Sequence, residues 1–273
     1  MALLKMNFLS QALRLQTNIT VILPTMSFAD MMDKKVDDYY NPANKFQTLW
    51  LLHGGSGDDA DWVNFTSVLR YAEANKLAVV MAPAFNSCYV DMAHGGNYYT
   101  FFTEELPKMC RAFFPLSDER EDNIIAGLSM GGMGTMLLAL KRPDLYGQAL
   151  CLSGAAQSYE EMVKRAASGD NMIRTDDIYG PLDSFKDGPW DAYAIAKTNI
   201  AENKPLPKFY FACGDKDFAL PGLRSAYEHL TALGYDTQKE EIPGYGHEWD
   251  FWDLYIRKAI YERLDLKRTP VRG

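Results

Sequence analysis

The sequence predicts an α/β fold in which a mostly parallel central sheet carries helices on both faces. The chain contains short, continuously apolar runs of the kind that lie inside parallel sheets, at residues 46–52, 78–82, 123–128, 148–153 and 208–213. Segments suited to helices separate these runs, and regular alternation of strands and helices favours parallel pairing. Ligands of such sheets bind at the carboxyl ends of the strands. The residues that directly follow each strand are therefore the first candidates for function.

The chain is expected to begin with an edge hairpin, because residues 8–17 alternate loosely and residues 19–23 are rich in β-branched side chains. The next elements, in order, are a polar connection at 30–45, the strand 46–52, a helix at 65–75, the strand 78–82, an aromatic loop at 84–97 and a helix at 98–114. Pro107 predicts a kink or a break in that last helix. Long loops at strand ends are commonly functional, so the aromatic loop is a candidate for substrate contact.

The second half continues the same alternation. After the central strand come a helix at 135–141, the strand 148–153, the strand 208–213, a helix at 223–233 that ends at Gly234, a strand at 237–242 and a helix at 248–264. Residues 154–207 are the least regular, with helical stretches at 159–167 and 190–197 and a polar turn at 168–171. This region is too short for a core of its own. We expect a small helical insertion over the site, within a single domain of residues 1–273.

The central strand ends in Gly127-Leu-Ser129-Met-Gly131, and a helix-compatible run follows directly. Strand, sharp turn and helix are the context of a nucleophile elbow, which presents a serine hydroxyl at the carboxyl edge of the sheet. The glycines would spare the Cβ atoms that collide where strand and helix cross. A glycine-rich turn that contains a serine by chance is the alternative, so the partners of Ser129 decide between the two.

A serine becomes a good nucleophile when a histidine takes its proton and a carboxylate orients that histidine. In the α/β-hydrolase fold the chain order is serine, acid, histidine. Ser129, Asp217 and His247 occur in this order, and each follows a predicted strand. They are the predicted catalytic triad, within an α/β-hydrolase fold.

Other residues compete for the roles of acid and base. Asp215 lies two residues before Asp217, and capping the turn is its simpler role. His229 falls within a predicted helix and is expected to be structural. His53 precedes a glycine pair and is expected to shape that loop, whereas His94 either contacts substrate or is a polar loop residue.

Backbone amides are expected to stabilise the negative charge of a tetrahedral intermediate. In this fold, one amide belongs to the residue after the nucleophile, here Met130. The second is expected in the turn that follows His53, and Gly55 is the predicted donor.

Composition excludes several classes of function. The net charge of −8 disfavours nucleic acid and anionic membranes as partners, because binding phosphates requires clustered basic residues. The four cysteines are widely spaced and are expected to be reduced thiols. The amino terminus lacks the pattern of an export signal and no stretch is long enough to span a membrane, so we expect a cytoplasmic protein. Oligomeric state stays open, and a homo-oligomer is possible.

Several motifs together resemble one known family. They are Leu52-His53-Gly54-Gly55-Ser56-Gly57, Tyr89-Val-Asp91-Met, Tyr98-Tyr99 leading to Glu104-Glu105-Leu106-Pro107, Ala126 to Gly132, and Gly246-His247-Glu248-Trp249-Asp250-Phe251-Trp252-Asp253. They are similar to the esterase D group of α/β-hydrolases, and most of all to its bacterial tributyrin esterase and acetylesterase branch, which includes feruloyl esterases.

The resemblance implies a serine carboxylesterase that uses neither cofactor nor metal and acts on small-molecule esters with short acyl chains, such as acetyl or butyryl. Acetylated sugars and feruloyl esters are possible substrates. The family also contains S-formylglutathione hydrolases and mycolyltransferases, so a thioesterase or an acyltransferase with the same triad remains an alternative. Against the thioesterase, this chain has His53-Gly54-Gly55 where those enzymes carry Ser-Gly-Leu. A non-catalytic binding module is a further alternative.

Four residues are candidates for the substrate pocket: Tyr89, Asp91, His94 and Trp249. For the aromatic residues, ordinary packing is the competing explanation, and for Asp91 it is a hydrogen bond that orders the loop. Activity is expected to fall at acid pH as His247 becomes protonated.

Overall fold

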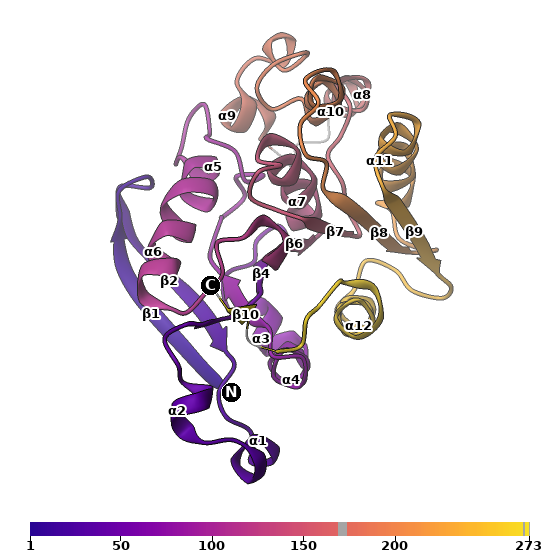
Figure 1. The fold of residues 1–273 in the computed structure, drawn as a ribbon. Helices are drawn as coiled ribbons and strands as arrows, with labels where there is room; N and C mark the ends of the chain where they lie inside the picture. Colours follow the sequence, from indigo (N-terminus) through magenta and orange to yellow (C-terminus); the bar gives the residue numbers. More distant parts are fainter. Residues whose placement is uncertain (169–173, 270, 273) are drawn as a thin grey trace.

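The computed structural model describes residues 1–168, 174–269 and 271–272. Within these residues a sheet of eight strands runs through the molecule in the order β1-β2-β5-β4-β6-β7-β8-β9 (Figure 1). The bounds are β1 Ala2–Ser10, β2 Leu15–Leu23, β4 Thr48–Leu52, β5 Ala78–Met81, β6 Asn123–Leu128, β7 Gln148–Leu152, β8 Lys208–Gly214 and β9 Thr237–Ile242. From β5 to β9 all neighbours are parallel, and β2 joins antiparallel to β5. The predicted mostly parallel sheet is confirmed.

Helices cover both faces of this sheet. Side chains of β4 alternate between the two layers, because Leu49 and Leu51 pack on one side while Trp50 and Leu52 pack on the other. The first layer holds α3 (Asp61–Phe65), α4 (Val68–Ala74), α12 (Trp249–Lys258) and the π-helical turn Ala259–Arg263. The second holds α6 (Leu106–Phe113), α7 (Met130–Lys141), α10 (Ala192–Ala201) and α11 (Leu220–Ala232).

The predicted amino-terminal hairpin is present as β1 and β2, although its first strand already begins at Ala2. The connection that follows is not irregular throughout. It contains two short helices, α1 (Phe28–Asp33) and α2 (Val36–Tyr39), which project from the end of the molecule that carries the N-terminus (Figure 1). Ser27 and Asp30 cap α1 reciprocally, and such local polar contacts allow a helix to form within a polar sequence. The same connection ends in a short strand, β3 (Asn44–Lys45), which pairs antiparallel with β10 (Val271–Arg272).

Two helix predictions are corrected by the structure. The helix expected at 65–75 is divided into α3 and α4, because Thr66 adopts an extended conformation between them. Pro107 does not break its segment, which runs from α5 (Tyr98–Thr100) through a π-helical turn at Phe101–Glu105 into α6. The π-helical turn, which is wider than an α-helical turn, ends at Glu105, shortly before Pro107. The carbonyl of Thr103, to which Pro107 cannot donate, accepts instead from Arg142 at 3.3 Å.

The predicted insertion is helical and lies next to α7 at the upper edge of the molecule (Figure 1). Its elements are α8 (Tyr159–Ala167), α9 (Thr175–Tyr179), a 3₁₀ turn at Leu182–Ser184, and α10. The turn predicted at 168–171 lies, beyond Ser168, outside the described residues. Two backbone bonds join α9 to the aromatic loop, from the Ala93 amide to the Ile178 carbonyl and from the His94 amide to the Asp177 carbonyl. The insertion therefore fixes one side of that loop.

Candidate active site

Ser129 lies between β6 and α7 in a conformation that L-amino acids rarely adopt, with φ 52° and ψ −118°. Its amide donates to the Leu152 carbonyl at 2.8 Å, which anchors the turn to β7. A Cβ at Gly127 would lie 2.4 Å from the Gly131 carbonyl oxygen, and one at Gly131 would lie 2.6 Å from the His53 carbonyl oxygen. Both glycines are therefore sterically required. Sequence reasoning missed a third, Gly154, whose Cβ would lie 2.3 Å from the carbonyl oxygen of Ser129.

Three loops at the carboxyl edge of the sheet bring Ser129, His247 and Asp217 together. The Nε2 atom of His247 lies 2.9 Å from the Ser129 hydroxyl oxygen. Its Nδ1 atom lies 3.0 and 3.1 Å from the two carboxylate oxygens of Asp217. A carboxylate accepts hydrogen bonds only, so Nδ1 carries the proton and Nε2 is free to accept from the serine.

The Asp217 carboxylate is kept ionised by its partners. Burial opposes ionisation, but hydrogen bonds from His247, from the Ala219 amide at 2.8 Å and from Ser153 outweigh it and lower the pKa of Asp217. Ser153 is itself held by Trp252, whose indole N–H donates to the Ser153 hydroxyl at 2.9 Å. The Trp252 ring also packs perpendicular to the ring of His247, with centroids 5.1 Å apart.

Sequence reasoning missed Ser153 and Trp252. Both stand where ligands of parallel sheets bind, since Ser153 follows β7 and Trp252 lies in the first turns of the helix after His247. This placement is the sequence signal by which both residues could have been found. The side-chain contact between them joins residues 99 positions apart, and no local pattern reports such a contact.

The competing acid and bases have other partners. Asp215 accepts the Gly244 amide at 2.8 Å and so links the loops that follow β8 and β9. His229 lies on α11 with its Nε2 atom 3.2 Å from the Tyr193 carbonyl, as expected of a structural histidine. His94 is exposed on the aromatic loop.

His53 is buried beneath the turn that follows β4. Its Nδ1 atom lies 2.6 Å from the Gly54 carbonyl, and its Nε2 atom accepts the Ala84 amide at 2.8 Å. Since Nε2 accepts a hydrogen bond from an N–H group, Nδ1 must be the nitrogen that carries the proton. Burial lowers the pKa of His53, which agrees with a neutral ring. The predicted role of His53 in shaping this loop matches its contacts.

The two predicted oxyanion donors belong to the two turns next to Ser129. Met130 is the first residue of α7, so its amide is among those without a carbonyl partner inside the helix, at the positive end of the helix dipole. Gly55 lies in a turn that a bond from the Gly57 amide to the Gly54 carbonyl closes. This turn lies against the elbow, because a Cβ at Gly54 would be 3.4 Å from the Cβ of Ser129.

The four pocket candidates are dispersed. Tyr89 is fully buried behind the glycine turn, where its hydroxyl donates to the His53 carbonyl at 2.8 Å. Asp91 orders its own loop by accepting the Thr100 amide and hydroxyl at 2.9 and 2.7 Å. Trp249 packs on Trp252, with ring centroids 5.0 Å apart, one ring removed from His247. His94 is exposed on the aromatic loop.

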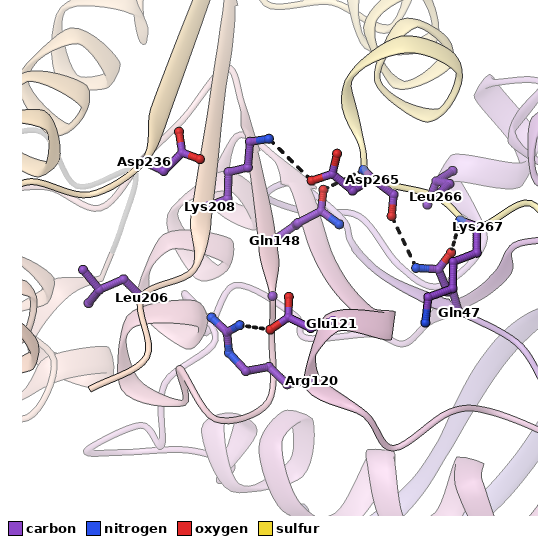
Figure 2. Close-up of a pocket in the computed structure, with 11 residues that line it drawn as sticks. Gln47, Arg120, Glu121, Gln148, Leu206, Lys208, Asp236, Asp265, Leu266 and Lys267 are labelled. Atoms are coloured by element: carbon purple, nitrogen blue, oxygen red, sulfur yellow. Dashed lines mark hydrogen bonds and ion pairs between the residues drawn. The ribbon is translucent and has the colours of Figure 1, made fainter. Parts of the chain in front are cut away.

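A large hollow lies at the other edge of the sheet. Figure 2 shows this cavity of about 590 Å³, whose lining includes Gln47, Gln148 and Lys208 at the amino ends of β4, β7 and β8. Polar contacts there hold the segment after α12. The Asp265 amide donates to the Gln148 side chain at 2.8 Å, and Lys208 pairs with the Asp265 carboxylate at 3.4 Å. Because Ser129 stands at the carboxyl edge, we assign this hollow no part in the chemistry.

The four cysteines, Cys88, Cys110, Cys151 and Cys213, are buried free thiols. Burial raises the pKa of Cys88, in the aromatic loop, to about 11, so this thiol is unreactive at neutral pH. Across the described ranges, no helix combines the length and the apolar character needed to cross a bilayer.

The parallel sheet, the strained serine between β6 and α7 and the loops after β8 and β9 define an α/β-hydrolase of the serine hydrolase class. Comparison with known proteins refines this class. The chain belongs to the family described as Putative esterase, whose model matches residues 30–254. The predicted family resemblance, fold and esterase activity are confirmed at this level, and the protein is a serine esterase whose substrate is a small-molecule ester.

Relatives of similar length support the same assignment. The chain is 32% identical to an acetyl esterase from Caldicellulosiruptor saccharolyticus over 95% of this chain and 97% of the relative. It is 33% identical to the fluorophosphonate-binding serine hydrolase F of Staphylococcus aureus, with a TM-score of 0.83 over 97% and 98% of the two chains. An S-formylglutathione hydrolase from Staphylococcus aureus is also 33% identical, with a TM-score of 0.80 over 97% and 99%.

Proposed function

We propose that Ser129 is the nucleophile, His247 the general base and acid, and Asp217 the carboxylate that orients His247. The observation that carries the proposal is the 2.9 Å contact between Ser129 and His247, with Asp217 on the opposite nitrogen. In this mechanism His247 takes the serine proton as the hydroxyl oxygen attacks the ester carbonyl. The amides of Met130 and Gly55 stabilise the resulting oxyanion.

Collapse of the tetrahedral intermediate breaks the bond between the acyl carbon and the alcohol oxygen. His247 passes its proton to that oxygen, and the alcohol leaves an acyl-enzyme on Ser129. A water molecule, activated by the same histidine, then releases the carboxylic acid and restores the serine.

We further propose that the acyl group is short, with acetyl as the first candidate. The acetyl esterase relative supports this preference. A narrow, mainly apolar cavity between α7 and the insertion supports it too, because it has room for about one water molecule. Met133, which lines this cavity, lies one helical turn after Ser129 and its amide donates to the Ser129 carbonyl. A cavity of this size suits an acetyl group better than a long chain.

A second candidate is hydrolysis of a thioester such as S-formylglutathione. The similarity to an S-formylglutathione hydrolase favours it, and both activities proceed through the same acyl-enzyme. Cys88 does not add a reactive thiol, because it is only 2% exposed. The two candidates therefore differ in the leaving group and not in the triad.

The test combines labelling with a substrate panel. An organophosphate should label the wild type at Ser129 and should leave Ser129→Ala unlabelled. The wild type should hydrolyse acetyl esters faster than butyryl esters and far faster than octanoyl esters, whereas S-formylglutathione should be the weaker substrate. Undiminished hydrolysis by Ser129→Ala would end the account of the nucleophile. Faster turnover of S-formylglutathione than of any ester would select the second candidate.

A further inference from the structure

Phe218 directly follows the carboxylate of the proposed triad and is 70% exposed. Its ring lies against the ring of His247, with centroids 4.4 Å apart and planes inclined by 37°. The backbone around it is fixed, because the Ala219 amide donates to the Asp217 side chain at 2.8 Å and the Leu220 amide donates to the Asp217 carbonyl at 3.1 Å. The turn that supplies the acid thus also presents an apolar ring beside the base.

The proposed mechanism determines which part of a bound ester lies beside the Phe218 ring. During acylation the alcohol oxygen must come within hydrogen-bond reach of the Nε2 atom of His247, which gives it a proton. The carbonyl oxygen is turned toward the amides of Met130 and Gly55, and the acyl group toward the Met133 side of α7. The group attached to the alcohol oxygen therefore extends past the imidazole, where Phe218 stands.

We propose that Phe218 is a specificity-determining residue that packs against the alcohol portion of the ester and favours apolar, ring-sized alcohols. This inference rests on the proposed roles of Ser129 and His247. An exposed phenylalanine gains free energy when an apolar group covers it, and ring pairs add a further contribution. A methyl group is too small to cover the ring. Benzyl and related alcohols are of the size that can.

The two half-reactions separate this role from others. In acylation, the Ser129 oxygen forms a bond to the acyl carbon, the bond from that carbon to the alcohol oxygen breaks, and the serine proton reaches the alcohol through His247. In deacylation, water has replaced the alcohol, so the same acetyl-enzyme forms from every acetate ester. A residue that contacts the alcohol alone affects acylation and leaves deacylation unchanged.

The experiment compares benzyl acetate with methyl acetate, because the two alcohols have similar acidity and differ in apolar size. Phe218→Ala should lower kcat/KM for benzyl acetate about tenfold, which corresponds to about 1.4 kcal/mol. For methyl acetate the change should stay within about twofold, and Phe218→Leu should recover part of the loss for the benzyl ester. The lifetime of the acetyl-enzyme, followed by mass spectrometry after rapid quenching, should equal that of the wild type.

Phe113→Ala is the matched control, because Phe113 is 68% exposed at the end of α6. It lies near the amino end of β4, where the Pro115 carbonyl accepts the Phe46 amide. This variant should not change the ratio of the two kcat/KM values. An equal loss for both esters in Phe218→Ala would overturn the proposal and show that the ring acts by positioning His247. An unchanged ratio with full activity would overturn it too. A wild type that hydrolyses neither ester would refute the proposed function itself, before any variant is compared.

Discussion

Replacing His53 tests whether the glycine turn needs the support that the structure gives it. His53 connects two backbone segments, through Nδ1 to the Gly54 carbonyl at 2.6 Å and through Nε2 to the Ala84 amide at 2.8 Å. Gly54 directly precedes Gly55, the proposed oxyanion donor. Loss of the imidazole should therefore weaken both the fold and the oxyanion site, although His53 does not touch the substrate.

The expected loss in stability follows from these contacts. Each hydrogen bond contributes about 1 kcal/mol net, and a buried amide left without a partner costs about 1–3 kcal/mol. His53→Ala breaks both bonds, opens a cavity and leaves the Ala84 amide unpaired, so we expect a loss of about 3–5 kcal/mol in the free energy of unfolding. Asparagine can still reach the Gly54 carbonyl, and glutamine can still accept the Ala84 amide. His53→Asn and His53→Gln should each lose about 2 kcal/mol.

The effect on catalysis distinguishes the two bonds. Removing one oxyanion donor costs about 100- to 1000-fold in rate, so this range is the upper limit for a displaced Gly55 amide. We expect kcat/KM for phenyl acetate to fall more in His53→Gln, which removes the side-chain bond to the Gly54 carbonyl, than in His53→Asn. Urea unfolding and steady-state kinetics on the same preparations measure both effects. An alanine variant that keeps its activity within twofold would refute the idea that His53 holds the oxyanion turn.

The dependence of stability on pH gives an independent check on His53. Burial lowers the pKa of His53 in the folded protein below the value of about 6.5 of an unfolded chain. Its contribution is thus complete above pH 6.5 and is lost as pH falls, because the unfolded chain binds a proton that the folded protein excludes. The slope reaches about 1.4 kcal/mol per pH unit for one group. His53→Gln should flatten the stability curve between about pH 5 and 6.5, where His229, whose pKa burial also lowers, still contributes.

Three further predictions concern the acid and the elbow. Asp217→Asn should lower kcat about 10⁴-fold, because the imidazole loses its orienting carboxylate. Asp215→Asn should leave kcat within a few-fold of the wild type, and equal losses for the two variants in steady-state assays would contradict the choice of Asp217 as the acid. Gly127→Ala places a Cβ 2.4 Å from a backbone oxygen, so we expect a loss of about 3 kcal/mol and a Tm lower by about 6–12 °C in calorimetry. Gly222→Ala on α11, whose added Cβ would meet its nearest atom at 3.9 Å, is the control and should stabilise the protein slightly. Ser153→Ala should lower kcat/KM about tenfold, because Asp217 loses one of the hydrogen bonds that keep its carboxylate ionised. The circular dichroism spectrum should be unchanged, and full activity would show that this bond is dispensable.

The sequence was sufficient for the features that local patterns encode. Continuous apolar runs located the buried strands, and the glycine spacing around Ser129 located the elbow, because both depend on backbone sterics over a few residues. The order of Ser129, Asp217 and His247 along the chain placed all three at one edge of the sheet. The structure brings these side chains within hydrogen-bond distance.

Features that depend on packing between distant segments could not be predicted in the same way. The sequence makes Tyr89 a candidate for the pocket because it is an aromatic loop residue, yet its hydroxyl donates to the His53 carbonyl and so supports that turn from behind. No sequence pattern indicates a role for Phe218, because a phenylalanine after an acidic residue is not a motif. Its position against His247 arises only when the loops after β8 and β9 meet. In both cases the residue type was visible and the direction of its side chain was not.

The elbow and the pocket differ in how much change they can absorb. Backbone segments pack closely around the elbow, since Cβ atoms at Gly127, Gly131 and Gly154 would all lie within 2.6 Å of a carbonyl oxygen. Backbone contacts of this kind cannot be relieved by a rotamer change, so the position of the nucleophile is fixed by the fold. Phe218 and Met133, in contrast, are proposed to meet the ester through their side chains, and side-chain substitution there leaves that backbone untouched. Changes in ester preference should therefore arise at these two positions, while the elbow keeps the same chemistry.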